Sequence, residues 1–190
     1  MNTSEQSYSK VVNRNEGGYA ALLFLVWPFM SLISAFKNYH KSWAKNIFWA
    51  FCAFYGYTFA IGADSAGTDI FMYLRDYQSI HGVPLTLTDV IRNFQQSGEI
   101  DILRTIISVT LSRFTDSPAA LTLTYGIIFG YFLSRNLWFL LDRLKGNIAP
   151  LSVLLIICFF MVNPIWNLNG FRFWTATHVF IYGLLPYLID

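Results

Sequence analysis

Long apolar runs separated by short polar stretches dominate the chain. The clearest runs cover residues 19–36, 46–63, 119–141, 148–162 and 173–189. Most approach the ~20 apolar residues that an α-helix needs to cross a bilayer. The pattern predicts an all-α fold, a polytopic transmembrane helical bundle with about five to six membrane helices. Residues 1–18 form a polar N-terminal tail, and residues 19–190 are expected to form a single transmembrane domain.

Residues 62–114 show a different, amphipathic pattern. One helical face is predicted where apolar residues recur at i, i+3, i+4 and i+7, namely Ile70, Tyr73, Leu74 and Tyr77. The same spacing recurs at Leu87, Val90, Ile91 and Phe94. Both segments are too short and too charged to span, so short amphipathic helices that lie on the membrane surface or pack over a cavity are expected. Residues 100–114 would reach only about 22 Å as a helix, which leaves a re-entrant, interfacial or short tilted helix.

The distribution of basic residues suggests an orientation. Lys37, Lys41 and Lys45 lie in one short loop, which the positive-inside rule assigns to the cytoplasm. Residues 62–98 then lie outside. The chain is accordingly expected to be a multi-pass protein of the cell inner (plasma) membrane, with the lipid bilayer as its surroundings.

Composition supports a membrane protein and excludes several other classes. Of 190 residues, 55% are hydrophobic, 18% aromatic and only 13% charged, where soluble domains have about 25% charged residues. The net charge of +2 and the absence of a basic patch argue against nucleic acid as a partner. Cys52 and Cys158 lie in apolar runs and are expected to be small buried hydrophobes. No metal-ligand spacing is present, and no cofactor is expected.

The polar stretch between the last two apolar runs is the strongest candidate for function. Pro164 and Gly170 interrupt the helical pattern there, and Arg172 is the one full charge between residues 149 and 188. An ionisable residue beside a membrane core is by default a functional hypothesis, although an arginine anchoring the chain at lipid phosphates is an equally weighted alternative. His178 is expected to form a hydrogen bond between helices rather than act as a base.

A polar set on one predicted side comprises Asp64, Asp69, Arg75, Asp76, Glu99, Asn169 and Arg172. A carboxylate can act as a general base toward a hydroxyl, and an arginine can hold a diphosphate leaving group. This pairing suits glycosyl transfer from a lipid-linked diphosphate sugar. For any single carboxylate, a solvated or helix-capping role is the more common explanation.

Three landmarks resemble the EpsG-like polysaccharide polymerases, which are relatives of the Wzy O-antigen polymerase. The segment from Gly67 to Tyr73 resembles their G-T-D-x-x-x-Y stretch, Glu99 opens the next hydrophobic helix, and the turn from Asn169 to Arg172 resembles their Asn followed by Arg-Gln. Ile100 and Phe173 depart from the family pattern, which has Pro and Gln there. Members are about twice as long, so this chain is expected to correspond to their N-terminal half and to be truncated at the C-terminus.

The resemblance implies a polymerase of exopolysaccharide, capsule or O-antigen biosynthesis. Its substrate would be an oligosaccharide repeat unit carried on polyprenyl diphosphate, and other polysaccharide-assembly membrane proteins are possible partners. By the same resemblance, the catalytic residues are Arg172, which contacts the diphosphate, and Asp69 or Glu99, which orients or deprotonates the acceptor hydroxyl. Further contacts to the substrate are expected from Tyr73, Arg75, Arg104 and Asn169.

Two alternatives from other classes stay open at this point. The short length favours a non-catalytic accessory subunit of a polysaccharide assembly complex. The Pro- and Gly-broken pair of apolar runs also resembles the discontinuous helices of transporters, which makes a transporter fragment the third hypothesis.

Overall fold

A computed structural model describes residues 16–59, 68–83, 88–89, 91–92, 95, 102–143, 154, 158–159 and 162–189. Within these ranges the secondary structure is helical, with no strand, which confirms the all-α prediction. Residues 16–26 are helical. The helices that follow are α2 (Pro28–Lys37), α3 (Ala44–Thr58), α4 (Asp69–Ile80), α6 (Ile102–Ser112), α7 (Pro118–Arg143), the 3₁₀ helix η2 (Ile165–Gly170) and α9 (Phe171–Ile189).

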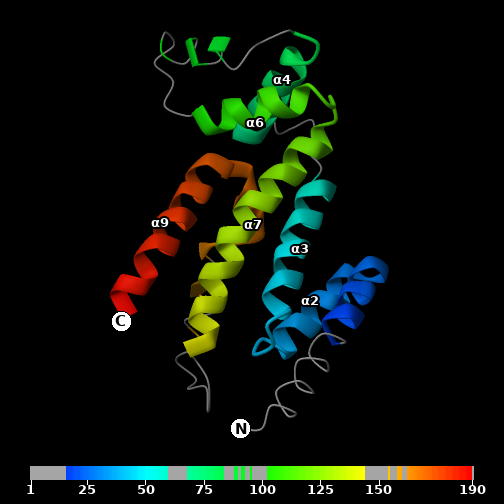
Figure 1. Cartoon of the computed structure of the whole chain (residues 1–190), viewed down its shortest axis with the longest axis vertical. Coiled ribbons are helices and arrows are strands. Elements are labelled where there is room, and N and C mark those ends of the chain that lie inside the picture. The colour runs from blue at the N-terminus through cyan, green and yellow to red at the C-terminus, as the bar shows by residue number, and fades with distance from the viewer. Residues whose placement is uncertain are drawn as a thin grey trace, which may run out of the picture.

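Helix α7 is the centre of the molecule. It lies between α3 on one side and α9 on the other, while α4 and α6 cross over one end of this three-helix layer (Figure 1). The short η2 contacts α3, α4, α7 and α9. The fold therefore gathers α4, α6, η2 and the first turn of α9 at the same end of α7.

Glycines allow α3 and α7 to approach closely. A Cβ atom added to Gly126 of α7 would lie 2.6 Å from the backbone oxygen of Cys52 and 3.2 Å from the Cα of Gly56, both on α3. Both neighbours are backbone atoms, so a side-chain movement could not relieve the contact. The pair is held further by the Trp49 indole, which donates a hydrogen bond of 2.8 Å to the Ile127 carbonyl. Cys52 is buried here, and burial raises the pKa of its thiol.

The first predicted run, residues 19–36, is not one helix but two, joined at Trp27. Trp27 leaves the helical conformation (φ −148°, ψ 86°), and Pro28 starts α2, where its missing N–H and fixed φ suit a first helical residue. The Ser31 hydroxyl donates a hydrogen bond of 3.0 Å to the Ala20 carbonyl, eleven residues earlier. In a continuous helix these residues would lie about 16 Å apart, so the chain folds back into a helical hairpin.

Helix α4 buries the face that its sequence pattern predicts. Ile70, Tyr73 and Tyr77 are buried and Leu74 is partly buried. Their partners are α6, α7 and η2, so the apolar face packs inside the protein rather than on a membrane. The Tyr77 hydroxyl donates a hydrogen bond to the Thr115 carbonyl, and burial together with the charge of Asp116 raises the pKa of Tyr77.

The predicted transmembrane bundle and the multi-pass inner-membrane location are both wrong. None of the helices in the described ranges combines the length and the apolar character needed to cross a bilayer. The hairpin halves the first run, and α3 has 15 residues, or about 22 Å against a hydrocarbon core of ~30 Å. Helix α7 is long enough with 26 residues, but Arg135, Asn136 and Asp142 interrupt its apolar sequence.

Several smaller expectations change with this correction. The inside–outside orientation inferred from the lysines required membrane-spanning helices, so it no longer has a basis. Cys158 is exposed, contrary to the expectation that both cysteines are buried. Residues 100–114 do contain a short helix, α6, but it packs on α4 and α7. Half of residues 87–94 and most of residues 148–162 lie outside the described residues.

Candidate functional site

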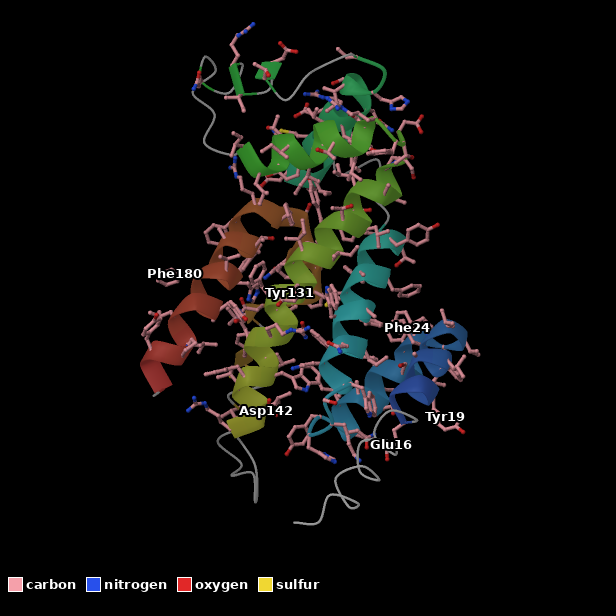
Figure 2. All side chains as sticks on the ribbon, in the orientation of Figure 1. Glu16, Tyr19, Phe24, Tyr131, Asp142 and Phe180 are labelled. Carbon is pink, nitrogen blue, oxygen red and sulfur yellow. The ribbon has the colours of Figure 1, made fainter. Side chains whose placement is uncertain are left out.

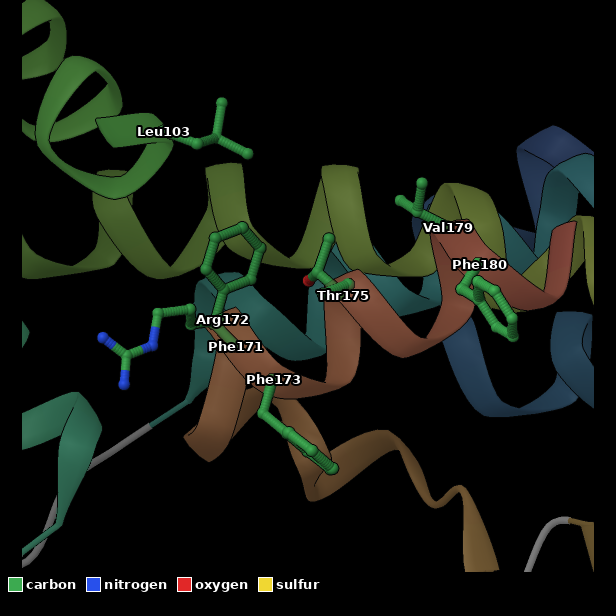
Figure 3. Close-up of a pocket in the computed structure, with 8 residues that line it drawn as sticks. Leu103, Phe171, Arg172, Phe173, Thr175, Val179 and Phe180 are labelled. Carbon is green, nitrogen blue, oxygen red and sulfur yellow. The ribbon is translucent and has the colours of Figure 1, made fainter. Parts of the chain in front are cut away.

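A cleft runs along the first half of α9, beneath α6. It has a volume of about 780 Å³, within the ~300–1,000 Å³ range of small-molecule sites. Figure 3 shows Leu103 reaching from α6 over α9, Arg172 extending at one end and Phe180 standing at the other. The described residues that line this α9 cleft are Leu103, Phe171, Arg172, Phe173, Thr175, Ala176, Val179 and Phe180.

The helical repeat of α9 builds the cleft wall. Arg172, Ala176, Val179 and Phe180 recur at i, i+4, i+7 and i+8, which places them on one helical face. From Arg172 to Phe180 the face extends about 12 Å. Arg172 is exposed, and its side chain extends at one end of an otherwise apolar wall (Figure 3). The cleft thus has a cationic end and an apolar length.

Phe171 fixes the start of this wall. Its ring is buried and stacks on Tyr125 of α7, with ring centres 3.9 Å apart and planes inclined by 9°. The Tyr125 ring in turn meets the edge of Tyr73 from α4 at 6.3 Å. Aromatic pairs of this kind contribute about 0.5–1.5 kcal/mol beyond their burial. Because Phe171 is anchored in the core, the backbone position of its neighbour Arg172 is fixed as well.

Arg104 of α6 packs on Tyr73, at the α4 end of this series of aromatic contacts. The Arg104 guanidinium lies 4.8 Å from the centre of the Tyr73 ring, and its Nη1 is 3.1 Å from the Asp76 carboxylate. Asp76, Arg104, Tyr73, Tyr125 and Phe171 thus form a connected series from the surface to the cleft. In this series Arg104 and Tyr73 hold α4, α6 and α7 together. Both residues therefore have a structural role, whereas the sequence analysis assigned them to substrate contact.

Substituting Asp76→Ala is expected to cost less than about 1 kcal/mol of unfolding free energy. Half of the Asp76 side chain is exposed, and exposed ion pairs contribute little. Arg104 keeps its contact with the Tyr73 ring in the variant. Urea denaturation followed by circular dichroism measures the change. A loss of 3 kcal/mol or more, far above the range for exposed pairs, would mean that the pair is a principal support of the α4–α6 contact.

The other predicted site residues are distributed as follows. Asp69 is exposed in the first turn of α4, and Arg75 is exposed on the same helix. Asn169 lies in η2 with its Oδ1 buried, and that atom has no hydrogen-bond partner among the described residues. Because α4 contacts η2, and η2 leads directly into α9, Asp69, Asn169 and Arg172 lie on elements that touch one another. Glu99 lies outside the described residues.

His178 is buried between α7 and α9, as the sequence predicts for a histidine bonded between helices. Asn136 Nδ2 lies 2.9 Å from the His178 carbonyl oxygen and 3.3 Å from His178 Nδ1, so it donates to both. The ring is therefore neutral, with its proton on Nε2. Burial lowers the pKa of His178 to about 4. Three buried atoms of this region have no hydrogen-bond partner within the described structure: His178 Nε2, Asn136 Oδ1 and Thr175 Oγ1.

Sequence reasoning missed most of the cleft wall. Leu103, Ala176, Val179 and Phe180 look like ordinary apolar residues, and only the spacing from Arg172 on one helix could have singled out the last three. Leu103 had no signal, because its place depends on how α6 crosses α9. In the described ranges, no group of three or more His, Cys, Asp or Glu side chains is arranged to hold a metal ion.

The geometry can hold an elongated ligand that is anionic at one end and apolar along its length. Comparisons with known proteins do not assign the chain to a family. No family model matches the chain, and neither curated proteins nor solved structures give a match.

Proposed function

We propose that the protein binds a polyprenyl-diphosphate-linked oligosaccharide in the α9 cleft and acts as a polymerase in bacterial polysaccharide biosynthesis. The observation that carries the proposal is the α9 cleft itself, in which Arg172 stands at one end of an apolar wall. A diphosphate ester of a long apolar alcohol has the matching pattern of charge and hydrophobicity. The resemblance of the segments around Asp69 and Arg172 to the EpsG-like polymerases supplies the rest.

The reaction would use a small set of groups. The hydroxyl of an acceptor sugar attacks the anomeric carbon of the donor, whose bond to the diphosphate oxygen breaks. A carboxylate takes the hydroxyl proton; Asp69 is exposed on an element that contacts η2 and suits this role, with Glu99 as the second candidate by resemblance. Arg172 stabilises the negative charge of the departing diphosphate.

Arg172→Ala is expected to weaken the binding of farnesyl diphosphate, a short soluble probe, about 10- to 100-fold. The reason is the loss of charge-assisted hydrogen bonds, which contribute about 1.5–3 kcal/mol. Isothermal titration calorimetry of the full chain measures the affinity. Farnesol, which lacks the diphosphate, should bind weakly to both proteins.

The matched control is Arg143→Ala. Arg143 ends α7, at the end of that helix opposite α4 and α6, and its guanidinium lies over the Phe139 ring. This change removes the same charge from the protein without touching the α9 cleft, so affinity should stay within about 2-fold. Equal losses in both variants would show that net charge, rather than the cleft, governs binding.

A further inference from the structure

The N-terminal hairpin, residues 16–37, has an outer side that no other described part of the protein covers. Its inner side packs on α3, where Phe24 meets Phe54 and Phe36 meets Phe48 at 5.7–6.2 Å between ring centres. The hairpin projects from the side of the bundle (Figure 2), beside α3 and away from α9. Its outer side is thus separate from the α9 cleft.

That outer side is apolar along its whole length. Its exposed large side chains are Tyr19, Leu22, Leu23, Leu25, Val26, Trp27, Phe29, Met30 and Ile33. Leu25 and Val26 are 80% and 84% exposed. No charged residue occurs in the sequence between Glu16 and Lys37. Two adjacent helices of about ten residues cover roughly 15 Å by 20 Å, about 300 Å², which is comparable to the largest apolar patch of a typical monomer, and such patches are often functional.

Positive charge gathers at one edge of this apolar face, where the two helices begin and end. Glu16 and Lys41 form an ion pair of 3.0 Å that closes the open end of the hairpin. Lys37 is exposed at the end of α2, and Lys45 follows in the first turn of α3. Three lysines against one glutamate leave this edge basic. An apolar face with a basic edge matches an anionic lipid surface, where acyl chains lie beneath phosphate groups.

We propose that the N-terminal hairpin docks face-on to one leaflet of an anionic lipid surface, without crossing it. The outer side chains enter the boundary between headgroups and acyl chains, a depth of about 5–10 Å for interfacial helices. Lys37 and its neighbours contact headgroup phosphates. Tyr19 and Trp27 are suited to this boundary because their rings are apolar with one polar atom.

The test is co-sedimentation of the full chain with vesicles made of equal parts phosphatidylglycerol and phosphatidylcholine. Leu25→Asp is expected to weaken binding at least 10-fold, because a buried leucine contributes about 1.5–3 kcal/mol and the new charge is repelled. Its side chain is mostly exposed, so the fold should survive, which thermal unfolding verifies. Tyr187→Asp is the matched control: Tyr187 is 86% exposed on α9, and its loss should leave vesicle binding unchanged.

Lys37→Gln tests the basic edge. One lysine near an anionic surface contributes about 1 kcal/mol, so binding should weaken roughly 5-fold at low salt and the difference should disappear at high salt. Three results overturn the proposal: wild-type protein that stays in the supernatant, Leu25→Asp that sediments like wild type, or light scattering that shows a dimer dissociated by Leu25→Asp. The last result would assign the same face to a second copy of the chain.

Discussion

Gly126→Ala is expected to lower the unfolding free energy by about 2–3 kcal/mol, with a fall in Tm of roughly 5–10 °C. The added methyl group would lie 2.6 Å from a backbone oxygen and 3.2 Å from a backbone Cα of α3. Helices α3 and α7 can relieve this contact only by separating, which loosens the buried interface that both helices share. Thermal unfolding followed by circular dichroism measures the change.

Gly183→Ala provides the same substitution without the clash. Gly183 lies within α9, and a Cβ atom there would have no described neighbour within 4 Å. Alanine is the better helix former by up to about 1 kcal/mol, so this variant should gain stability by a few degrees in Tm. A Gly126→Ala protein as stable as Gly183→Ala would contradict the close packing of α3 on α7.

Acid is expected to destabilise the protein through His178, by up to roughly 3 kcal/mol between pH 6.5 and pH 4. Burial lowers the pKa of His178 to about 4 in the folded state, against about 6.5 in an unfolded chain. Between these values the unfolded state binds more protons, so stability falls as the pH falls. Well above pH 6.5 the histidine is neutral in both states and this contribution is constant. Urea denaturation at a series of pH values measures the slope.

His178→Leu isolates this effect from other acid-sensitive groups. Leucine cannot bind a proton, and Asn136 still has the backbone carbonyl of residue 178 as an acceptor. The difference in stability between wild type and variant should therefore change with pH by the predicted amount. A difference that is constant from pH 7 to pH 4 would show that His178 does not hold its proton-free form in the fold.

The sequence predicted the helices better than it predicted their surroundings. The face of α4 and the position of α7 follow from the spacing of apolar residues. The hairpin could not be predicted from this spacing, because Pro28 is compatible both with a kink inside a helix and with the first turn of a new helix. Apolar runs also look alike whether their partners are lipid chains or other helices, which is why the membrane-spanning prediction failed.

The candidate site was predictable only where charge marks it. Arg172 stood out as the one full charge among apolar residues. Arg104 was also singled out, but its partners Asp76 and Tyr73 depend on the crossing of α4 over α6, which spacing within one helix cannot reveal. The buried pair of Asn136 and His178 brings together residues 42 positions apart. Contacts at this separation are set by tertiary packing.

Photo-crosslinking tests most directly whether the α9 cleft binds a lipid-linked diphosphate. A farnesyl diphosphate analogue with a photoreactive group on its apolar chain is irradiated with the full chain, and labelled peptides are located by mass spectrometry. If the cleft binds this ligand, labels are expected on Leu103 and on the cleft wall between Phe173 and Phe180, and unlabelled farnesyl diphosphate should compete for them. Labels confined to the N-terminal hairpin, or labels on α9 that excess farnesyl diphosphate does not displace, would contradict it.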